Sequence, residues 1–457
     1  MTYAQHVRAT LALGLPLIGS HLAQFAITLT DAVMLGWYDV MALAAQVLGG
    51  MVFFVLFIMG SGFAFGVMPM VATAAAAGDD RQVRRITRMG LWISTGFGLL
   101  TLPIFLLSER ILSAVGQPPH IAALAGDYLR IAGLAMIPAL LVMVLKSYFS
   151  ALERTRIVLW VTLAAVGVNI VVNYALIFGH WGAPELGIRG AAFASLAVQS
   201  ASLVGLVVYA IVIAPEQALF QRLWRPDREA LAEVFRLGWP IGLTNLAEVG
   251  LFAAASVMMG WLGTLPLAAH GIALQISSVA FMVHLGFSNA ATIRVGRARG
   301  RDDAQALIRG AQVVIGLSMA AVLISVLLFL GLPEPLLGLF IDPADPDRAQ
   351  VIAIGIGLLA AAALFQVVDA AQVVALGLLR GVQDARIPMV MAGVSYWLVG
   401  VPVAYLLGFP LGLGGIGIWL GLAAGLALAG ILMMTRFWRM ALRQRRGALR
   451  AAAERTA

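Results

Sequence analysis

Three carboxylates interrupt long apolar stretches of this chain: Asp31, Glu248 and Asp369. If such stretches cross a membrane, each acid costs about 2.5 to 3.5 kcal/mol on insertion scales. An acid is kept at that depth when it binds a proton, binds a cation or faces water. The three residues therefore predict sites of proton or cation exchange.

Asp31 has candidate partners with side chains that can share a proton. Gln24 lies one heptad earlier on the same helical face, and Asn169 and Asn173, four residues apart, share a face of a later helix. Amides can donate hydrogen bonds to an ionised carboxylate or accept one from its protonated form. This group predicts a proton switch. The alternative is that the asparagines only join neighbouring helices through hydrogen bonds.

Glu248 and Asp369 both lie in the second half of the chain, each with polar and aromatic neighbours on its helical face. The neighbours are Thr244, Asn245 and Phe252 for Glu248, and Phe365, Gln366 and Gln372 for Asp369. An oxygen-rich pocket with two carboxylates suits a hard cation such as sodium. A shared proton is a second possibility. A third is that neighbouring hydroxyls and amides simply cap each acid.

The composition determines the class of protein that carries these acids. With 61% hydrophobic and 11% charged residues, the chain is no water-soluble globule, which has about 25% charged residues. A crossing helix needs roughly 20 apolar residues. Twelve such runs are predicted, the first retained rather than cleaved, at roughly 11–37, 42–76, 88–108, 122–150, 157–179, 187–213, 238–261, 265–292, 306–332, 350–379, 387–409 and 412–437. The absence of Cys excludes a catalytic thiol and thiolate metal sites.

The chain also contains an internal repeat. Leu13-Gly14-Leu15-Pro16 matches Leu237-Gly238-Trp239-Pro240, 224 positions later, and the same offset places Gln24 on Glu248. Six crossings per copy make the copies parallel repeats, which suits alternating access. We expect an all-α polytopic membrane protein, with twelve transmembrane helices in two pseudo-symmetric six-helix bundles around a central cleft. The predicted parts are a bundle over 1–214, a linker over 215–236, a bundle over 237–440 and a basic tail over 441–457.

Basic residues follow the predicted crossings. Of the 30 Lys and Arg residues, all but Arg110, Arg130, Arg189 and Arg348 fall in the termini and one set of alternating loops, Arg380 included. The positive-inside rule then places both termini in the cytoplasm. Membrane orientation explains the net charge of +8, so no nucleic-acid partner is expected.

Longer motifs resemble the NorM branch of the multidrug and toxic compound extrusion (MATE) transporters over essentially the whole chain. They are Leu237-Gly238-Trp239-Pro240 through Glu248 to His270, Ser277-Ser278, Arg294-Val295-Gly296, Phe365-Gln366-Val367-Val368-Asp369-Ala370-Ala371-Gln372, Leu379-Arg380-Gly381, Asp31 before Met34-Leu35-Gly36, and Asn169-Ile170-Val171-Val172-Asn173.

The resemblance implies a secondary antiporter. We expect it to lie in the inner membrane of a bacterium and, since nothing in the sequence demands an oligomer, to be monomeric. It would exchange bulky, hydrophobic, mainly cationic drugs for inward sodium or protons, with no other cofactor and no enzymatic activity. Glu248, Asp369 and Phe365 would form a cation site, holding sodium if the protein is sodium-coupled. Asp31, Asn169, Asn173 and Gln24 would form the protonation and drug-coupling site. Some relatives have Tyr in place of Phe365, so a hydroxyl that could coordinate sodium is missing here. Some relatives have an acid in place of Asn173, and the amide here leaves Asp31 as the only carboxylate of its cluster.

Other functions remain as alternatives. A lipid-linked precursor flippase of the same superfamily should carry basic residues in the cleft, and the predicted helices contain almost none. An intramembrane hydrolase would need a recognisable short motif around its acids, and a channel should pass single-channel currents. The chain has no Walker pattern, which argues against ATP hydrolysis.

Overall fold

The computed structural model describes residues 2–213, 215 and 218–456, with side chains described as far as residue 447. Every regular element among these residues is a helix. Asp39 begins α2 by accepting hydrogen bonds from the backbone nitrogens of Met41 and Ala42. Asp79 does the same for α3 through Gln82. Such caps satisfy backbone donors that a helix leaves unpaired at its start.

Twelve helical spans in the described residues are long and apolar enough to cross a membrane, which confirms the predicted all-helical class. They are α1 (Tyr3–Tyr38), α2 (Val40–Ala76), α3 (Asp80–Leu106), the run Pro119–Ala151 made of α5 (Pro119–Ala132), η1 (Gly133–Ala135) and α6 (Met136–Ala151), α7 (Thr155–Phe178), α8 (Ile188–Val212), α9 (Arg228–Leu262), α10 (Thr264–Gly300), α11 (Ala304–Gly331), α13 (Arg348–Gly381), the run Arg386–Gly408 made of α14 (Arg386–Gly393), η4 (Val394–Gly400) and α15 (Val401–Gly408), and α16 (Gly414–Thr456).

Shorter helices lie in three of the connections. They are α4 (Ser108–Ala114), η2 (His180–Gly182) and α12 (Pro333–Gly338). Arg130 pairs with Glu109 and Asp127 near α4, and Arg189 pairs with Asp127. Three of the four arginines on the sparsely basic side therefore bind protein groups. Arg130 and Arg189 pair with acids, and Arg348 donates a hydrogen bond to the carbonyl oxygen of Ile341.

The connection between the repeats is shorter than the predicted linker. Helix α9 begins at Arg228 because Asp227 accepts a hydrogen bond from the Ala230 nitrogen at 3.1 Å and caps it. Residues 228–236 were predicted as linker and are helical. Glu216 and Gln217, also in that linker, lie outside the described residues. Residues 441–456 of the predicted basic tail likewise continue α16.

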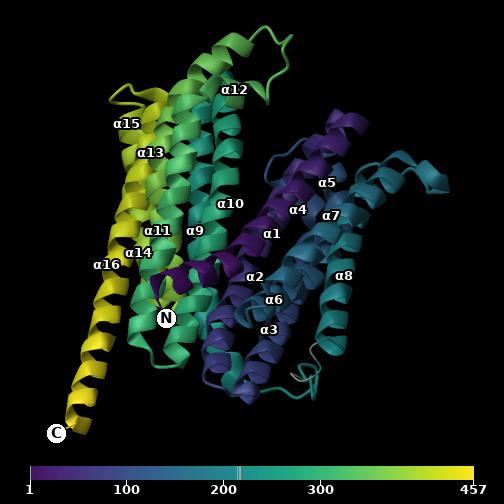
Figure 1. The fold of residues 1–457 in the computed structure, drawn as a ribbon. Coiled ribbons are helices and arrows are strands. Elements are labelled where there is room, and N and C mark those ends of the chain that lie inside the picture. The colour runs from purple at the N-terminus through teal and green to yellow at the C-terminus, as the bar shows by residue number, and fades with distance from the viewer. Residues whose placement is uncertain (1, 214, 216–217, 457) are drawn as a thin grey trace. The chain divides into compact units, whose positions relative to one another are not determined.

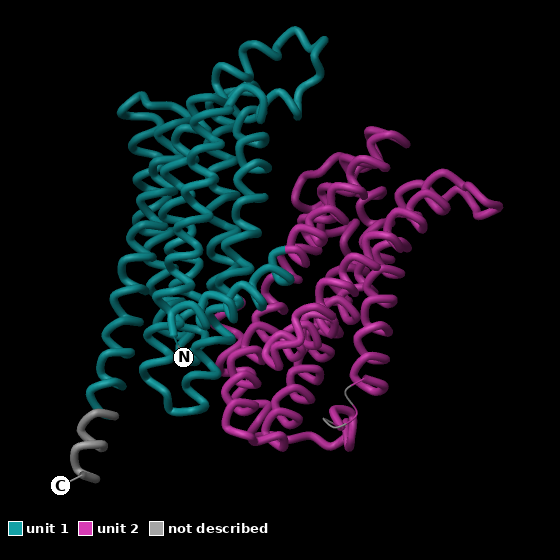
Figure 2. Tube along the Cα trace, viewed as in Figure 1, with its two compact units in different colours: residues 1–18, 243–457 teal, residues 19–242 magenta. Residues whose placement is uncertain are grey.

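The chain divides into two compact units (Figure 2). Unit 1 contains residues 1–18 and 243–457, and unit 2 contains residues 19–242. Helix α1 changes unit after Ile18 and helix α9 changes unit after Gly242. These two positions are equivalent under the repeat offset, so each unit contains the first segment of the other repeat's leading helix.

Each unit has its own apolar core. In unit 2 the core includes fully buried Leu35, Leu129, Met136 and Leu140, from α1, α5 and α6. In unit 1, α13 packs against both α10 and α16. Large buried rings there include Phe365, Tyr396 and Trp419. Both cores are built around the helices that carry the predicted acids.

Candidate cation and proton sites

In unit 2, two amides converge on one carboxylate oxygen. Asn169 and Asn173 of α7 donate hydrogen bonds from Nδ2 to Asp31 Oδ1 on α1, at 2.8 and 2.6 Å. Both asparagines are fully buried and Asp31 is 8% exposed. The spacing of four residues puts both amides on one face of α7. The structure therefore brings together three of the four residues predicted for this site.

The cluster has unused hydrogen-bonding capacity. The Oδ1 atoms of Asn169 and Asn173 are buried and have no hydrogen-bond partner among the described residues. An ionised Asp31 accepts the two amide N–H groups, whereas a protonated Asp31 presents an O–H that an amide oxygen can accept after rotation. The buried ring of Tyr128 also interacts electrostatically with Asp31. The chemistry of this group fits reversible protonation.

Gln24 lies apart from this cluster. Its side chain is exposed. A separation of seven residues corresponds to roughly 10 Å along a helix, too far for a hydrogen bond between side chains of this length held on one face. Gln24 and Asp31 therefore share a face of α1 but lie about two turns apart along it. The role predicted for Gln24 stays a prediction.

In unit 1, Glu248 and Asp369 interact electrostatically across α9 and α13. Asp369 is 1% exposed. Glu248 Oε1 and Asp369 Oδ1 are buried oxygens without a hydrogen-bond partner among the described residues. Two buried acids near each other cannot both remain ionised without a compensating charge. The pair therefore requires a cation, a proton or a basic side chain.

A basic side chain is present beside Glu248. Arg380, in the last turn of α13, donates from Nη2 to Asn245 Oδ1 at 2.7 Å and interacts electrostatically with Glu248. Asn245 lies one helical turn before Glu248 on α9. Arg380 was predicted to lie in a loop with the other cations, and this prediction is wrong: the side chain is 7% exposed, inside unit 1. A polar partner and an acid on α9 hold it inside.

Further oxygens and hydroxyls surround the same part of unit 1. Gln372 donates from Nε2 to the hydroxyl of Tyr396 at 2.7 Å, and Tyr396 interacts electrostatically with Glu248, Asp369 and Arg380. Tyr396 and Ser395 lie on η4, a π-helical turn. Such turns occur often at functional sites because they displace side chains from the regular helical positions. Here the turn brings a phenol to the carboxylates.

The donor set determines which ions these residues could bind. The described residues include no group of three or more His, Cys, Asp or Glu side chains able to hold a metal. The available ligands are the carboxylates of Glu248 and Asp369 and four neutral oxygens. These four are buried without a hydrogen-bond partner among the described residues: Gln366 Oε1, Gln372 Oε1, Ser277 Oγ and Ser395 Oγ. Oxygen donors of this kind suit a hard monovalent cation better than a transition metal.

Phe365, predicted as part of the cation site, lies in an aromatic cluster. Its ring is 2% exposed and packs edge-on against Trp419, with centroids 5.3 Å apart, and against Phe252, with centroids 5.8 Å apart. It lies one helical turn before Asp369. The ring therefore forms an apolar wall beside the acid, and direct contact with a cation stays a prediction.

His270 extends this wall into a hydrogen-bonded chain. Trp419 Nε1 donates to His270 Nδ1 at 3.1 Å, and His270 Nε2 lies 3.1 Å from Ser256 Oγ. The indole N–H can only donate, so Nδ1 must accept, and Nε2 carries the ring proton. In this arrangement His270 is the neutral Nε2–H tautomer and orients Trp419 against Phe365.

Comparison with known proteins decides the family. The family model described as MatE matches residues 16–175 and 240–406. A protein named probable multidrug resistance protein NorM from Agrobacterium fabrum is 48% identical over 440 residues, covering 95% of this chain and 94% of that protein. One of the same name from Rhizobium meliloti is 47% identical, covering 96% and 94%. The chain belongs to the MatE family.

Solved structures agree with this assignment at the level of the fold. The outward-facing conformation of a multidrug resistance MATE family transporter matches with a TM-score of 0.87 at 18% identity, covering 97% of this chain and 99% of that chain. The eukaryotic MATE transporter AtDTX14 matches with a TM-score of 0.85, also at 18% identity, covering 97% and 99%. The predicted resemblance to the NorM branch is confirmed, and this MatE protein is a transporter rather than an enzyme.

Sequence reasoning missed several residues of the sites in this MatE protein. Arg380 was hidden because it ends an apolar run, where an arginine usually reaches the lipid headgroups. Tyr128 and Tyr396 gave no signal, since tyrosines are common near membrane interfaces. The sequence around Trp419 did not distinguish it from an ordinary buried aromatic residue. Of these residues, only Arg380 had a sequence signal, because it lies in the motif Leu379-Arg380-Gly381.

Proposed function

We propose that the chain is a secondary antiporter that exports bulky, hydrophobic, mainly cationic drugs in exchange for inward sodium or protons. The observation that carries the proposal is a buried acid cluster in each unit: Asp31 with its asparagines, and Glu248 with Asp369. The names of the relatives, which describe multidrug resistance proteins, support the substrate class.

Charge balance in unit 1 supports exchange of one monovalent cation. Arg380 compensates one of the two negative charges of Glu248 and Asp369. The remaining charge needs a single proton or sodium ion, because an unpaired buried carboxylate is costly. Asp369 is the better candidate for the exchanging group, since Arg380 interacts with Glu248. If sodium binds, the amide and hydroxyl oxygens near Asp369 complete its coordination.

The Asp31 cluster supports a second role, coupling the cation to the drug. A protonated Asp31 is neutral and suits an empty or neutral pocket, whereas an ionised Asp31 attracts a cationic drug. A cation can drive export only if it binds the two conformations with different affinity. The membrane potential adds about 2.3 kcal/mol per charge per 100 mV to an inward cation.

The same proposal places the protein in the inner membrane of a bacterium, as a monomer with both termini in the cytoplasm. The uneven distribution of arginines supports the orientation. The three paired arginines on the sparsely basic side, Arg130, Arg189 and Arg348, have charges already bound by protein groups.

The test is ethidium efflux from proteoliposomes under separately imposed sodium and proton gradients. Wild type is compared with Asp31→Asn, Glu248→Gln and Asp369→Asn. We expect one gradient to drive efflux and each substitution to reduce it at least tenfold. Glu334→Gln is the control, because Glu334 is an exposed acid on α12 and its loss should leave efflux unchanged.

The gradient that drives efflux identifies the ion. If neither gradient drives efflux while ethidium binding remains intact, drug antiport is rejected and translocation of a lipid-linked precursor is the next activity to assay. If Glu334→Gln reduces efflux as strongly as Asp369→Asn, the buried acids have no special role.

A further inference from the structure

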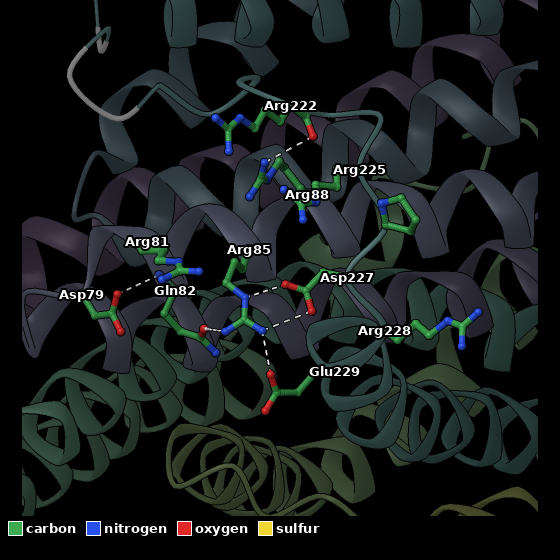
Figure 3. Close-up of a pocket in the computed structure, with 11 residues that line it drawn as sticks. Asp79, Arg81, Gln82, Arg85, Arg88, Arg222, Arg225, Asp227, Arg228 and Glu229 are labelled. Carbon is green, nitrogen blue, oxygen red and sulfur yellow. Dashed lines mark hydrogen bonds and ion pairs between the residues drawn. The ribbon is translucent and has the colours of Figure 1, made fainter.

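A strongly basic cavity lies in unit 2, formed by residues outside both acid clusters. It has a volume of about 680 Å³ and is lined by residues 79–88 and 222–229, at the start of α3 and in the segment that leads into α9 (Figure 3). The lining includes six arginines and three acids, a net charge of +3: Arg81, Arg85, Arg88, Arg222, Arg225, Arg228, Asp79, Asp227 and Glu229.

The three acids are already used by protein groups. Arg85 binds Asp227 Oδ2 at 2.5 Å and Glu229 Oε2 at 2.8 Å. Asp79 accepts from the Gln82 nitrogen and caps α3. Asp227 also caps α9. The three carboxylates therefore neutralise Arg85 and the helix ends. They do not pair with the other lining arginines, whose positive charges stay unneutralised.

The other five lining arginines form no ion pair in the described part of the chain: Arg81, Arg88, Arg222, Arg225 and Arg228. Arg88 instead donates from Nη1 to the carbonyl oxygens of Gln221 and Arg222, at 2.5 and 3.3 Å. This contact brings Arg222 and Arg88 into electrostatic interaction with each other. Like charges gathered in a partly enclosed space repel each other, and a bound anion relieves the repulsion.

Two tryptophans place the cavity at the level of lipid headgroups. Trp92 of α3 is 44% exposed and donates from Nε1 to the Leu223 carbonyl at 2.8 Å. Trp224 is 77% exposed. Exposed tryptophans next to arginines, near the end of a crossing helix, are typical of the membrane–water interface. An anion reaching this cavity can therefore come from the bilayer itself.

We propose that this cavity binds the phosphate group of an anionic phospholipid. Arg88, Arg222 and Arg225 supply planar guanidinium donors, which suit phosphate oxygens. Bound lipid would link the segment before α9 to α3, and Trp92 and Trp224 would contact the glycerol and upper acyl region. A free phosphate ion offers the same oxygen chemistry without the acyl chains.

The test uses the purified, delipidated full-length chain in nonionic detergent. Phosphatidylglycerol, phosphatidylcholine or inorganic phosphate is titrated, and binding is followed by native mass spectrometry and by the shift in unfolding temperature. The site variant is Arg222→Gln/Arg225→Gln. The control is Arg439→Gln/Arg443→Gln, which removes the same charge from an exposed face of α16 in unit 1.

We expect saturable binding of phosphatidylglycerol, with phosphatidylcholine at least tenfold weaker. The site variant should weaken phosphatidylglycerol binding at least tenfold, and the control variant less than twofold. Because neither Arg222 nor Arg225 is buried, both variants should keep the unfolding temperature of lipid-free wild type. That measurement separates lost binding from lost folding.

Two results would overturn the proposal. Equal weakening in the site and control variants would mean that phosphatidylglycerol responds only to overall charge. Saturable binding of inorganic phosphate that depends on Arg222 and Arg225, with no binding of phosphatidylglycerol, would assign the cavity to a soluble phosphate and reject the lipid.

Discussion

The backbones of Gly62 and Gly242 touch: a Cβ atom built on Gly62 would lie 2.3 Å from the Gly242 nitrogen. The contact joins α2 to the first segment of α9 within unit 2. The repeat offset moves this pair onto Gly286 and Ile18, and a Cβ on Gly286 would lie 2.9 Å from the Ile18 nitrogen in unit 1. The internal repeat is therefore visible as the same close approach made twice.

Substitution of Gly62 tests this contact. Gly62→Ala should destabilise the protein by about 1–3 kcal/mol, because backbone atoms of α9 cannot move aside as a flexible side chain could. Thermal unfolding in detergent measures the loss. Gly167→Ala on α7 is the control, since a Cβ there meets nothing within 4 Å. A similar loss in both variants would mean that glycine itself, rather than the close approach, matters.

The Asp31 cluster predicts energetic coupling between α1 and α7. Asn173→Ala removes a charge-assisted donor and should cost about 1.5–3 kcal/mol. In a double-mutant cycle with Asp31→Ala, most of that cost should disappear, because the donor has nothing left to bind. Thr162→Ala, which removes a buried hydroxyl about three turns before Asn173 on α7, should instead be additive with Asp31→Ala. Additive behaviour of Asn173→Ala would contradict the observed contact.

The electrostatic interaction between Arg380 and Glu248 predicts a rescue. Arg380→Gln should destabilise unit 1 by about 3 kcal/mol, because the half-buried Glu248, with one fully buried oxygen, loses its compensating charge. Adding Glu248→Gln should recover part of this loss in thermal unfolding. Asn245→Ala removes one hydrogen-bond acceptor of Arg380 and leaves both charges in place, so Glu248→Gln should not rescue it. If Glu248→Gln makes Arg380→Gln worse, the two charges do not compensate each other.

The Arg85–Asp227 pair predicts a contribution to stability that does not vary with pH in the range where transport would be assayed. The hydrogen bond from Arg85 lowers the pKa of Asp227 from 3.8 to about 2. A lowered pKa means that the pair stabilises the fold above pH 4 and is lost as pH falls toward 2. Asp227→Asn keeps the helix cap but removes the charge, and should cost up to about 1 kcal/mol.

That cost should be equal at pH 8 and pH 5 when wild type and Asp227→Asn are unfolded side by side. The comparison also separates this ion pair from transport, because any change in efflux between these pH values must come from other groups. A cost that shrinks at pH 5 would show that Arg85 does not hold the carboxylate ionised.

Much of the fold could be predicted because membrane insertion imposes a one-dimensional rule. Each crossing needs a long apolar run, and all twelve predicted runs coincide with helical spans. The start of α9 was misplaced because residues 228–236 are too polar to resemble a crossing. The helix continues there because Asp227 caps it and Arg85 of α3 binds the cap, and contacts of this kind leave no periodic signal.

Sequence alone was enough to predict the class of protein, the repeat and the three acids, since an apolar run of crossing length and a charge inside it are both visible among neighbouring residues. Tertiary structure decided which groups meet each acid. Arg380 reaches Asn245, 135 positions away, and Asn169 reaches Asp31, 138 positions away. A hydrogen bond depends on distance and direction to within a few tenths of an ångström. Only the packing of the helices fixes those quantities.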